Sequence, residues 1–116
     1  MVEGIGGVFF RARDPDALRA WYAKHLGIAM EDFGTVFTAK DGEQTVWAPF
    51  AADTDYFGSR EQQLMVNYRV SDLDALLEQL RGAGVTVDEN VHELEFGRFG
   101  WAVDPEGNRF ELWEPA

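Results

Sequence analysis

One carboxylate near the end of the sequence is placed where it could do chemistry. Glu111 lies between Phe110 and Leu112 in a run that alternates polar and apolar side chains. Such alternation predicts a strand with one buried face. A carboxylate on the buried face could act as a general base or as a metal ligand. Without a metal, it needs hydrogen-bond donors, a proton or a cationic ligand.

Other residue types that carry out catalysis are scarce. The 116 residues include no cysteine and two histidines, His25 and His92. The composition excludes disulfides, thiolate metal sites and a cysteine nucleophile. Ser59 and Ser71 show no pairing with a histidine and a carboxylate, so a hydrolytic triad is not indicated. Any metal site would depend on carboxylates, carbonyls or water.

The charge of the chain restricts its partners. Acidic residues number 21 and basic residues 10, which gives a formal net charge of −11. Nucleic acid would be repelled, so we expect no such partner. A small cationic ligand would be attracted to an acidic cleft, although an acidic surface also serves solubility. The sequence has neither a long apolar run nor a signal-peptide layout, so we expect a cytoplasmic protein without membrane contacts.

The sequence contains an internal repeat. The run 8–18 resembles the run 66–76 at a constant offset of 58, and seven of the eleven positions agree in identity or aromatic class. Self-similarity at this spacing indicates two copies of one supersecondary unit. We therefore expect a single domain over 1–116, with unit one at about 1–58 and unit two at about 64–116.

Each unit begins with a strand and continues with a helix. The β-rich runs lie at 8–12 and 64–70. Asp14 followed by Pro15 predicts the start of the first helix, and Ser71 with Asp74 three residues later predicts the start of the second. Apolar stripes should face the core, from Leu18, Trp21, Tyr22 and Leu26 in one helix and from Leu73, Leu76, Leu77 and Leu80 in the other.

After each helix the pattern changes to alternation with a period of two. Gly27 and Gly84 occupy positions typical of left-handed helix caps. Hairpins are then expected at 36–48, around Asp41-Gly42, and at 99–113, around the turn 104–107. A weaker strand should lie within 29–35 and another within 85–95. The order βαβββ therefore occurs twice, with eight strands in all.

The second hairpin also resembles a family signature. Residues 99–114 read Phe-Gly-Trp-Ala-Val-Asp-Pro-Glu-Gly-Asn-Arg-Phe-Glu-Leu-Trp-Glu. This segment is similar to the C-terminal signature of the vicinal oxygen chelate superfamily, which includes glyoxalase I, bleomycin-resistance proteins and dioxygenases. The resemblance covers the whole chain because the superfamily is built from the same repeat. It implies an α+β fold in which two tandem βαβββ units form a curled mixed sheet around a cup, with the helices outside.

The resemblance also provides a test for a metal site. Metal-dependent members place one ligand on each of four strands, and these positions fall on Glu111 and near Gly7, Val46 and Met65. Glycine and valine have no donor, and a thioether is a poor ligand for hard divalent ions. We therefore expect no metal cofactor; the alternative is a divalent metal with Glu111 as its only surviving family ligand.

If Glu111 faces the cup, strand alternation gives the rest of the lining. Gly7, Gln44 and Ala48 share this face with the expected ligand-binding residues, which are Phe9, Arg11, Val46, Met65, Asn67, Arg69, Arg109, Glu111 and Trp113. Gly7 could leave room for a ligand. The arginines could form a structural ion-pair network or clamp a ligand carboxylate or phosphate.

Three functions remain open at this point. The first is a metal-free binder of a small, cationic molecule, similar to antibiotic-sequestering members of the superfamily. The second is a glyoxalase-like lyase, isomerase or dioxygenase that uses Glu111 as a catalytic base or metal ligand. The third is a homodimeric module, because members of the superfamily often dimerise. Its interface could use the aromatic residues around the linker, Trp47, Phe50, Tyr56 and Phe57.

Overall fold

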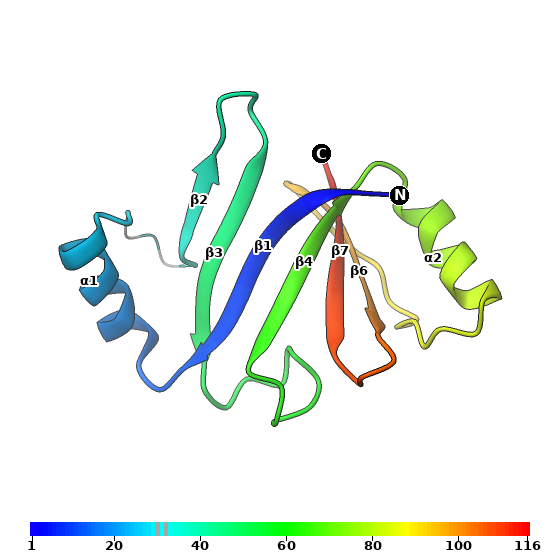
Figure 1. Ribbon diagram of the computed structural model, residues 1–116. Helices are drawn as coiled ribbons and strands as arrows, with labels where there is room; N and C mark the ends of the chain where they lie inside the picture. The colour runs from blue at the N-terminus through cyan, green and yellow to red at the C-terminus, as the bar shows by residue number, and fades with distance from the viewer. Residues whose placement is uncertain (30, 32) are drawn as a thin grey trace.

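The computed structural model describes residues 1–29, 31 and 33–116 and shows one continuous curled sheet with two helices (Figure 1). The elements follow the repeat that the sequence predicts. In chain order they are β1 (Val2–Ala12), α1 (Pro15–Leu26), β2 (Thr35–Thr38), β3 (Gln44–Ala51), β4 (Leu64–Val70), α2 (Leu73–Gly82), β5 (His92–Leu94), β6 (Gly97–Val103) and β7 (Arg109–Pro115).

The sheet joins the two units edge to edge. Its strand order is β2-β3-β1-β4-β7-β6-β5. The first strands of the units, β1 and β4, pair antiparallel at the centre, and each pairs in parallel with the last strand of its own unit, β3 or β7. The mixed α+β architecture of two repeated units is therefore confirmed.

The sheet has seven strands among the described residues, rather than the eight expected. The weaker strand of unit two is present as β5, supported by a bridge between Val87 and Ala102. For the weaker strand expected within 29–35, the structure gives an isolated bridge between Glu31 and Gly34. Residues 30 and 32 lie outside the described residues. Thr35 belongs to β2, which forms the hairpin with β3.

The helix ends follow capping chemistry, with one correction. The Asp14 side chain accepts from the Ala17 N–H at the start of α1, and Gly27 closes that helix in the left-handed region, both as predicted. The prediction that Ser71 caps α2 is wrong. Asp72 is the cap, and its side chain accepts from the Ala75 N–H. The repeat agrees with this cap, since Asp72 aligns with Asp14 at the offset of 58.

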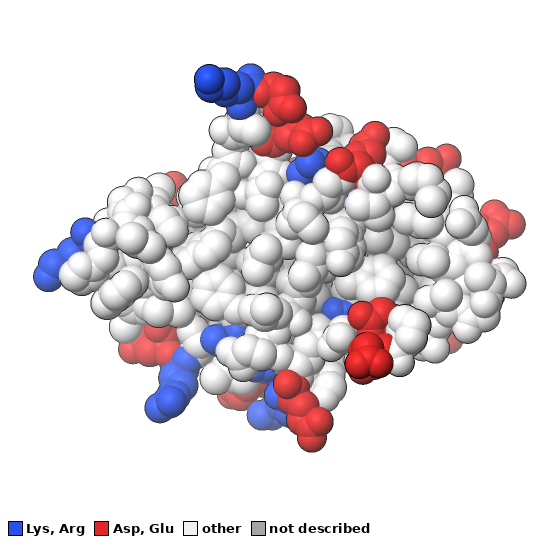
Figure 2. Space-filling model, in the orientation of Figure 1, with Lys and Arg blue, Asp and Glu red and all other residues white. Residues whose placement is uncertain are grey.

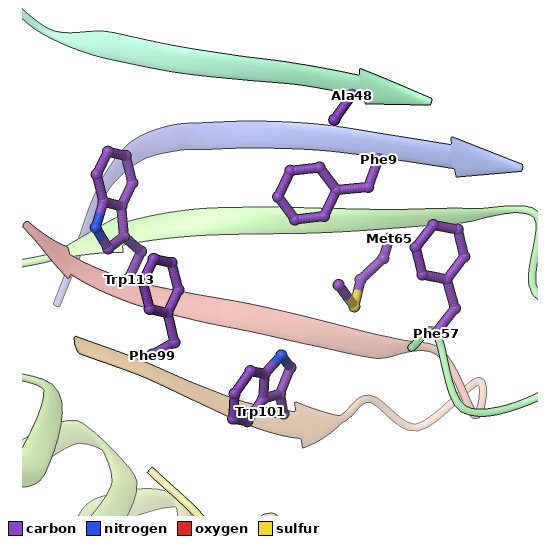
Figure 3. Packing of buried hydrophobic residues seen from close by; sticks show 7 residues of the cluster. All are labelled: Phe9, Ala48, Phe57, Met65, Phe99, Trp101 and Trp113. Carbon is purple, nitrogen blue, oxygen red and sulfur yellow. The ribbon is translucent and has the colours of Figure 1, made fainter. Parts of the chain in front are cut away.

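The side chains separate into two apolar clusters, one on each face of the sheet. The cluster on the concave face contains Phe9, Ala48, Phe57, Met65, Phe99, Trp101 and Trp113 (Figure 3). The cluster on the outer face lies under α2 and contains Val70, Leu73, Leu76, Leu77 and Leu112. Strand alternation explains the division, because neighbouring residues of one strand point to opposite faces.

The two helices cover the outer face unequally. In α2, Leu73, Leu76 and Leu77 of the predicted stripe are buried and Leu80 is partly buried, whereas α1 has no buried residue. The prediction that Trp21 and Leu26 face the core is wrong, since they are 51% and 64% exposed. The ring of Tyr22 in α1 contacts the ring of Trp47 in β3. Within the described part of the chain, neither helix has the length and apolarity needed to cross a membrane.

Candidate functional site

Glu111 lies on the concave face and is almost completely buried, at 1% exposure. Its Oε2 atom accepts hydrogen bonds from the hydroxyl of Tyr56 and from the Trp101 Nε1–H at 2.9 Å. Its Oε1 atom accepts from the Asn67 Nδ2–H at 2.5 Å. Three side-chain donors from three parts of the chain therefore hold this carboxylate, which a buried acid requires.

The environment of Glu111 changes its acidity. Burial raises the pKa of Glu111 above its ordinary value, although the three donors and the Arg109 guanidinium act in the opposite direction. Burial and the neighbouring carboxylate also raise the pKa of Tyr56. The phenol consequently stays protonated and acts as a donor to Glu111.

Sheet register places four positions in one row across the cup. Gly7 pairs with Val46 on one side and with Asn67 on the other, and Asn67 pairs with Glu111. The residue beside Glu111 is thus Asn67, two positions after Met65. The parallel pairing of β4 with β7 sets this neighbour, and the pairing of β1 with β4 is regular from the pair of Gly7 with Asn67 to the pair of Phe10 with Leu64.

This row does not fit a resident divalent metal. Of its four residues, only Glu111 and Asn67 have side-chain oxygen donors, and hard divalent ions take several oxygen ligands. No group of three or more histidine, cysteine, aspartate or glutamate side chains that could hold a metal occurs among the described residues.

Asn67 carries an additional feature of the site. The residue is 2% exposed, and its Oδ1 atom has no hydrogen-bond partner among the described residues. This oxygen lies close over Gly6, where a Cβ atom would collide with it. An unpaired buried acceptor costs about 1–3 kcal/mol, so the amide is held at Glu111 against an energetic penalty.

The segment that connects the two units covers the concave face. We call residues 52–63, between β3 and β4, the cover segment. It brings the Tyr56 hydroxyl to Glu111 and buries Phe57 completely beside Met65 (Figure 3). The guanidinium of Arg11 donates to four backbone carbonyls of this segment, those of Ala52, Thr54, Ser59 and Gln62, at 2.7–3.0 Å.

Arg69 and Arg109, like Arg11, are engaged within the protein. Arg69 donates to the carbonyls of Ile5 and Gln44 and forms an ion pair with Glu43 at 2.9 Å. Arg109 donates to the carbonyl of Tyr56 and pairs with Asp88 at 3.2 Å. Most of their partners are backbone carbonyls, so these arginines hold strands and loops together.

The apolar residues expected in the cup do lie on its face. Phe9, Met65 and Trp113 belong to the concave cluster, and Val46 packs against it. The expectation that Gly7 leaves room for a ligand is wrong in this structure. A Cβ atom at Gly7 would lie 3.0 Å from the Phe9 ring and from the Val46 carbonyl oxygen. Phe9 and Val46 therefore occupy the space directly over Gly7.

Sequence reasoning missed Tyr56 as a site residue. Tyr56 and Phe57 were considered for a dimer interface; this prediction is wrong for Phe57, which is fully buried, and Tyr56 is hydrogen-bonded to Glu111. Phe50 also packs against the concave cluster. The aromatic pair Tyr56-Phe57 at the unit boundary was the available signal, but no local pattern indicates which face it covers.

Comparison of the fold with solved structures finds close similarity over nearly the whole chain. Methylmalonyl-CoA epimerase from Streptomyces coelicolor, in complex with 2-nitronate-propionyl-CoA, has a TM-score of 0.76 at 16% identity, covering 100% of this chain and 99% of that one. Methylmalonyl-CoA epimerase from Mycobacterium tuberculosis has a TM-score of 0.70 at 23% identity, covering 99% and 89%. These similarities establish the fold.

A third structure belongs to a protein with a different description. The NAD-dependent benzaldehyde dehydrogenase from Legionella pneumophila has a TM-score of 0.64 at 16% identity, covering 95% of this chain and 98% of that one. A sequence comparison with curated proteins gives no match. The family model for a glyoxalase-like domain matches residues 7–113. This match includes both units and the row through Glu111, so the chain belongs to the glyoxalase-like domain family of the vicinal oxygen chelate superfamily.

Proposed function

We propose that this protein binds a small cationic molecule at Glu111 on the concave face, without a resident metal. The observation that carries the proposal is the buried Glu111 carboxylate, which three side-chain donors hold in the family's ligand row. Burying a carboxylate is costly unless it is well paired. A protein that needed only a packed core could place an apolar side chain here at no such cost.

Two features favour a cationic ligand with N–H donors. The protein carries a net charge of −11, which attracts cations over a long range. At the site, the Glu111 carboxylate adjoins the unpartnered oxygen of Asn67. After rotation of the amide, this oxygen and the carboxylate could both accept from an ammonium or guanidinium group. Such charge-assisted hydrogen bonds are among the stronger ones in proteins.

The ligand would reach Glu111 by taking the place of the Tyr56 hydroxyl. Tyr56 is only partly buried, and much of the cover segment around it is exposed. Trp101 and Asn67 lie on strands within the sheet, so strand pairing fixes their backbone positions. Tyr56 is therefore the one of the three donors that lies outside the strands and can withdraw together with its backbone.

Isothermal titration calorimetry tests this proposal with bleomycin, spermidine and arginine methyl ester, and with succinate as an anionic comparison. The Glu111→Gln variant should lose binding of the cations by about tenfold or more, since a charge-assisted bond is removed. Glu106→Gln is the matched control, because it removes the same charge from an exposed turn. Equal affinities in both variants, or no heat with any cation, would refute the proposal.

Tyr56→Phe tests the route to the site. If the ligand displaces the hydroxyl, this variant should bind more tightly than the wild type, because the competing hydrogen bond is gone. A weaker affinity would mean that Tyr56 contacts the ligand instead of making way for it.

A second candidate function is catalysis, as a glyoxalase-like lyase, isomerase or dioxygenase with Glu111 as the base. The raised pKa of Glu111 favours it, because a general base works best when its pKa is near the working pH. A suitable test is deuterium exchange into methylmalonyl-CoA in D₂O, followed by NMR. Exchange by the wild type but not by Glu111→Gln would support an enzyme.

The metal-dependent form of this alternative has its own test. Bound metal is measured after purification, and the melting temperature is recorded with Mn²⁺, Ni²⁺ and Zn²⁺. The two oxygen donors of the row predict no bound metal and no change in melting temperature. A stoichiometric metal, or a large upward shift, would contradict this prediction.

A further inference from the structure

The outer face of the sheet carries a groove that lies opposite Glu111. Figures 1 and 2 view the molecule from this side, and the surface over β1 and β4 between the helices is uncharged (Figure 2). The groove has a volume of about 690 Å³ and lies between β4, β7 and α2. Clefts of about 300–1,000 Å³ typically bind small molecules. The binding site proposed above does not include this groove, because Glu111 lies on the concave face.

The lining of the groove changes from polar to apolar along its length. Because β4 and β7 run parallel, their first residues lie at the same edge of the sheet. The polar side chains gather at this edge, together with the turn that leads into β7, and include Glu61, Gln62, Asp104 and Arg109. The remainder is apolar and includes Leu64, Val66 and Tyr68 of β4, Leu76 and Leu80 of α2 and Leu112 of β7. The apolar part extends about 13 Å along β4.

The polar end of the groove is built by a bridge between two strands. The parallel pairing of β4 with β7 covers residues 67–69 and 111–113. Nearer to the start of both strands, the side chain of Gln62 joins them. Its Nε2 donates to the carbonyls of Leu64 and Arg109 at 2.9 and 2.7 Å, and its Oε1 accepts from the Arg109 N–H at 2.8 Å. Gln62 is 8% exposed, so a buried and well-bonded amide preforms this end of the groove.

The charges at the polar end favour a cationic group. The Arg109 guanidinium already forms an ion pair with Asp88 at 3.2 Å. Glu61 is exposed, and the Asp104 carboxylate accepts from the Asn108 N–H at 2.9 Å, a bond that lowers the pKa of Asp104 and keeps it charged. Two carboxylates therefore border this end beside one arginine that has its own partner. The net charge of −11 also disfavours an anionic ligand.

We propose that this groove binds a cationic amphiphile, with its ammonium group beside Glu61 and Asp104 and its apolar body along β4. The body covers Leu64, which is 52% exposed, and lies over Leu112, which is buried in the outer cluster. Contact with apolar side chains removes the body from water, and the two carboxylates select the sign of the head group. This second site does not depend on ligand binding at Glu111.

Isothermal titration calorimetry with octylammonium tests the proposal, with butylammonium and octanoate as comparisons. Butylammonium has the same head group on a shorter body, and octanoate has a body of similar length with the opposite charge. Both should bind at least about tenfold more weakly than octylammonium. Equal affinity of butylammonium would overturn the role of the apolar part, and equal affinity of octanoate would overturn the choice of a cation. No heat with octylammonium would overturn the proposal as a whole.

Two substitutions with matched controls locate the site. Leu64→Gln should weaken octylammonium binding by about tenfold, because it removes apolar contact. Its control is Leu94→Gln, since Leu94 is 54% exposed and does not line the groove. Glu61→Gln should weaken binding by about threefold, as expected for an exposed charge. Its control is Glu78→Gln, which removes the same charge from an exposed position of α2 outside the lining. Equal losses in a variant and its control would contradict the assignment.

Octylammonium can also occupy the concave site, so the titrations are repeated with Glu111→Gln. The groove should bind octylammonium with the same affinity in this variant. Loss of all binding in folded Glu111→Gln would place the amphiphile on the concave face and overturn the proposal. Light scattering is recorded on the same samples. A wild type with twice the chain mass of 13.1 kDa and no heat would assign the groove to a second copy instead. Circular dichroism with thermal melting checks that each variant is folded.

Discussion

Replacing Arg11 by methionine should loosen the cover segment. The Arg11 guanidinium donates four hydrogen bonds to backbone carbonyls, at 2.9, 2.9, 2.7 and 3.0 Å, and lies 5.1 Å from the centre of the Phe57 ring. Methionine keeps much of the length and the apolar contact, but removes every donor. The Arg11→Met substitution therefore isolates the hydrogen bonds from the packing.

The magnitude follows from where the four carbonyls lie. The bond to the carbonyl of Gln62 is buried, and an unpaired buried acceptor costs about 1–3 kcal/mol. The other three are partly buried, so water can replace most of the loss. We expect a loss of about 2–4 kcal/mol in the free energy of unfolding. For a chain of 116 residues, 3 kcal/mol lowers the melting temperature by about 12 °C.

Urea unfolding gives the free energy, and limited trypsin digestion reports on the segment itself. Arg60 is exposed within the cover segment, so the variant should be cut there faster than the wild type. Arg13→Met is the matched control, because Arg13 is exposed and its loss changes the charge equally. Equal stability and equal digestion of the two variants would refute the role of Arg11.

Three further predictions concern Glu111, Gly6 and the cap of α2. Folding raises the pKa of Glu111, so its contribution to stability is present below its ordinary pKa of about 4.5 and is lost as the pH rises through the raised pKa. Urea unfolding from pH 4 to 8 should therefore show the stability of the wild type falling with pH relative to Glu111→Gln, and parallel curves would contradict this. Gly6→Ala should destabilise the protein by about 1–3 kcal/mol in thermal unfolding, because a Cβ atom collides with Asn67; an unchanged melting temperature would show that the amide moves freely. Asp72→Ala should cost about 1 kcal/mol as the loss of a helix cap, whereas Ser71→Ala should cost much less; the reverse order in urea unfolding would contradict the assignment.

The repeat made most of the fold predictable. The matching runs at 8–18 and 66–76 indicate two units before any strand is placed. Strand alternation then assigned Phe9, Met65 and Glu111 to the same face, as the structure has them. These predictions succeed because they depend on local periodicity, which is a property of the chain itself.

The errors concern features that depend on long-range packing. The parallel register of β4 with β7 places Asn67, two residues from the expected Met65, beside Glu111. The spacing of the repeat cannot reveal such a shift. The hydrogen bond between Tyr56 and Glu111 joins residues 55 positions apart through a segment without periodicity. The exposure of Trp21 likewise reflects how closely α1 approaches the sheet, which a helical pattern does not determine.

The central claim, that a small cation binds at Glu111, is tested most directly through the indole of Trp101. This N–H donates to Glu111, so its NMR signal reports on the carboxylate. Trp101→Phe assigns it among the four tryptophan indole signals. A cation that gives heat in calorimetry, such as bleomycin or spermidine, is then titrated into the labelled protein. We predict that this indole signal shifts with the calorimetric affinity in the wild type and stays constant in Glu111→Gln. Binding heat with an unmoved Trp101 signal would place the ligand elsewhere and contradict the account.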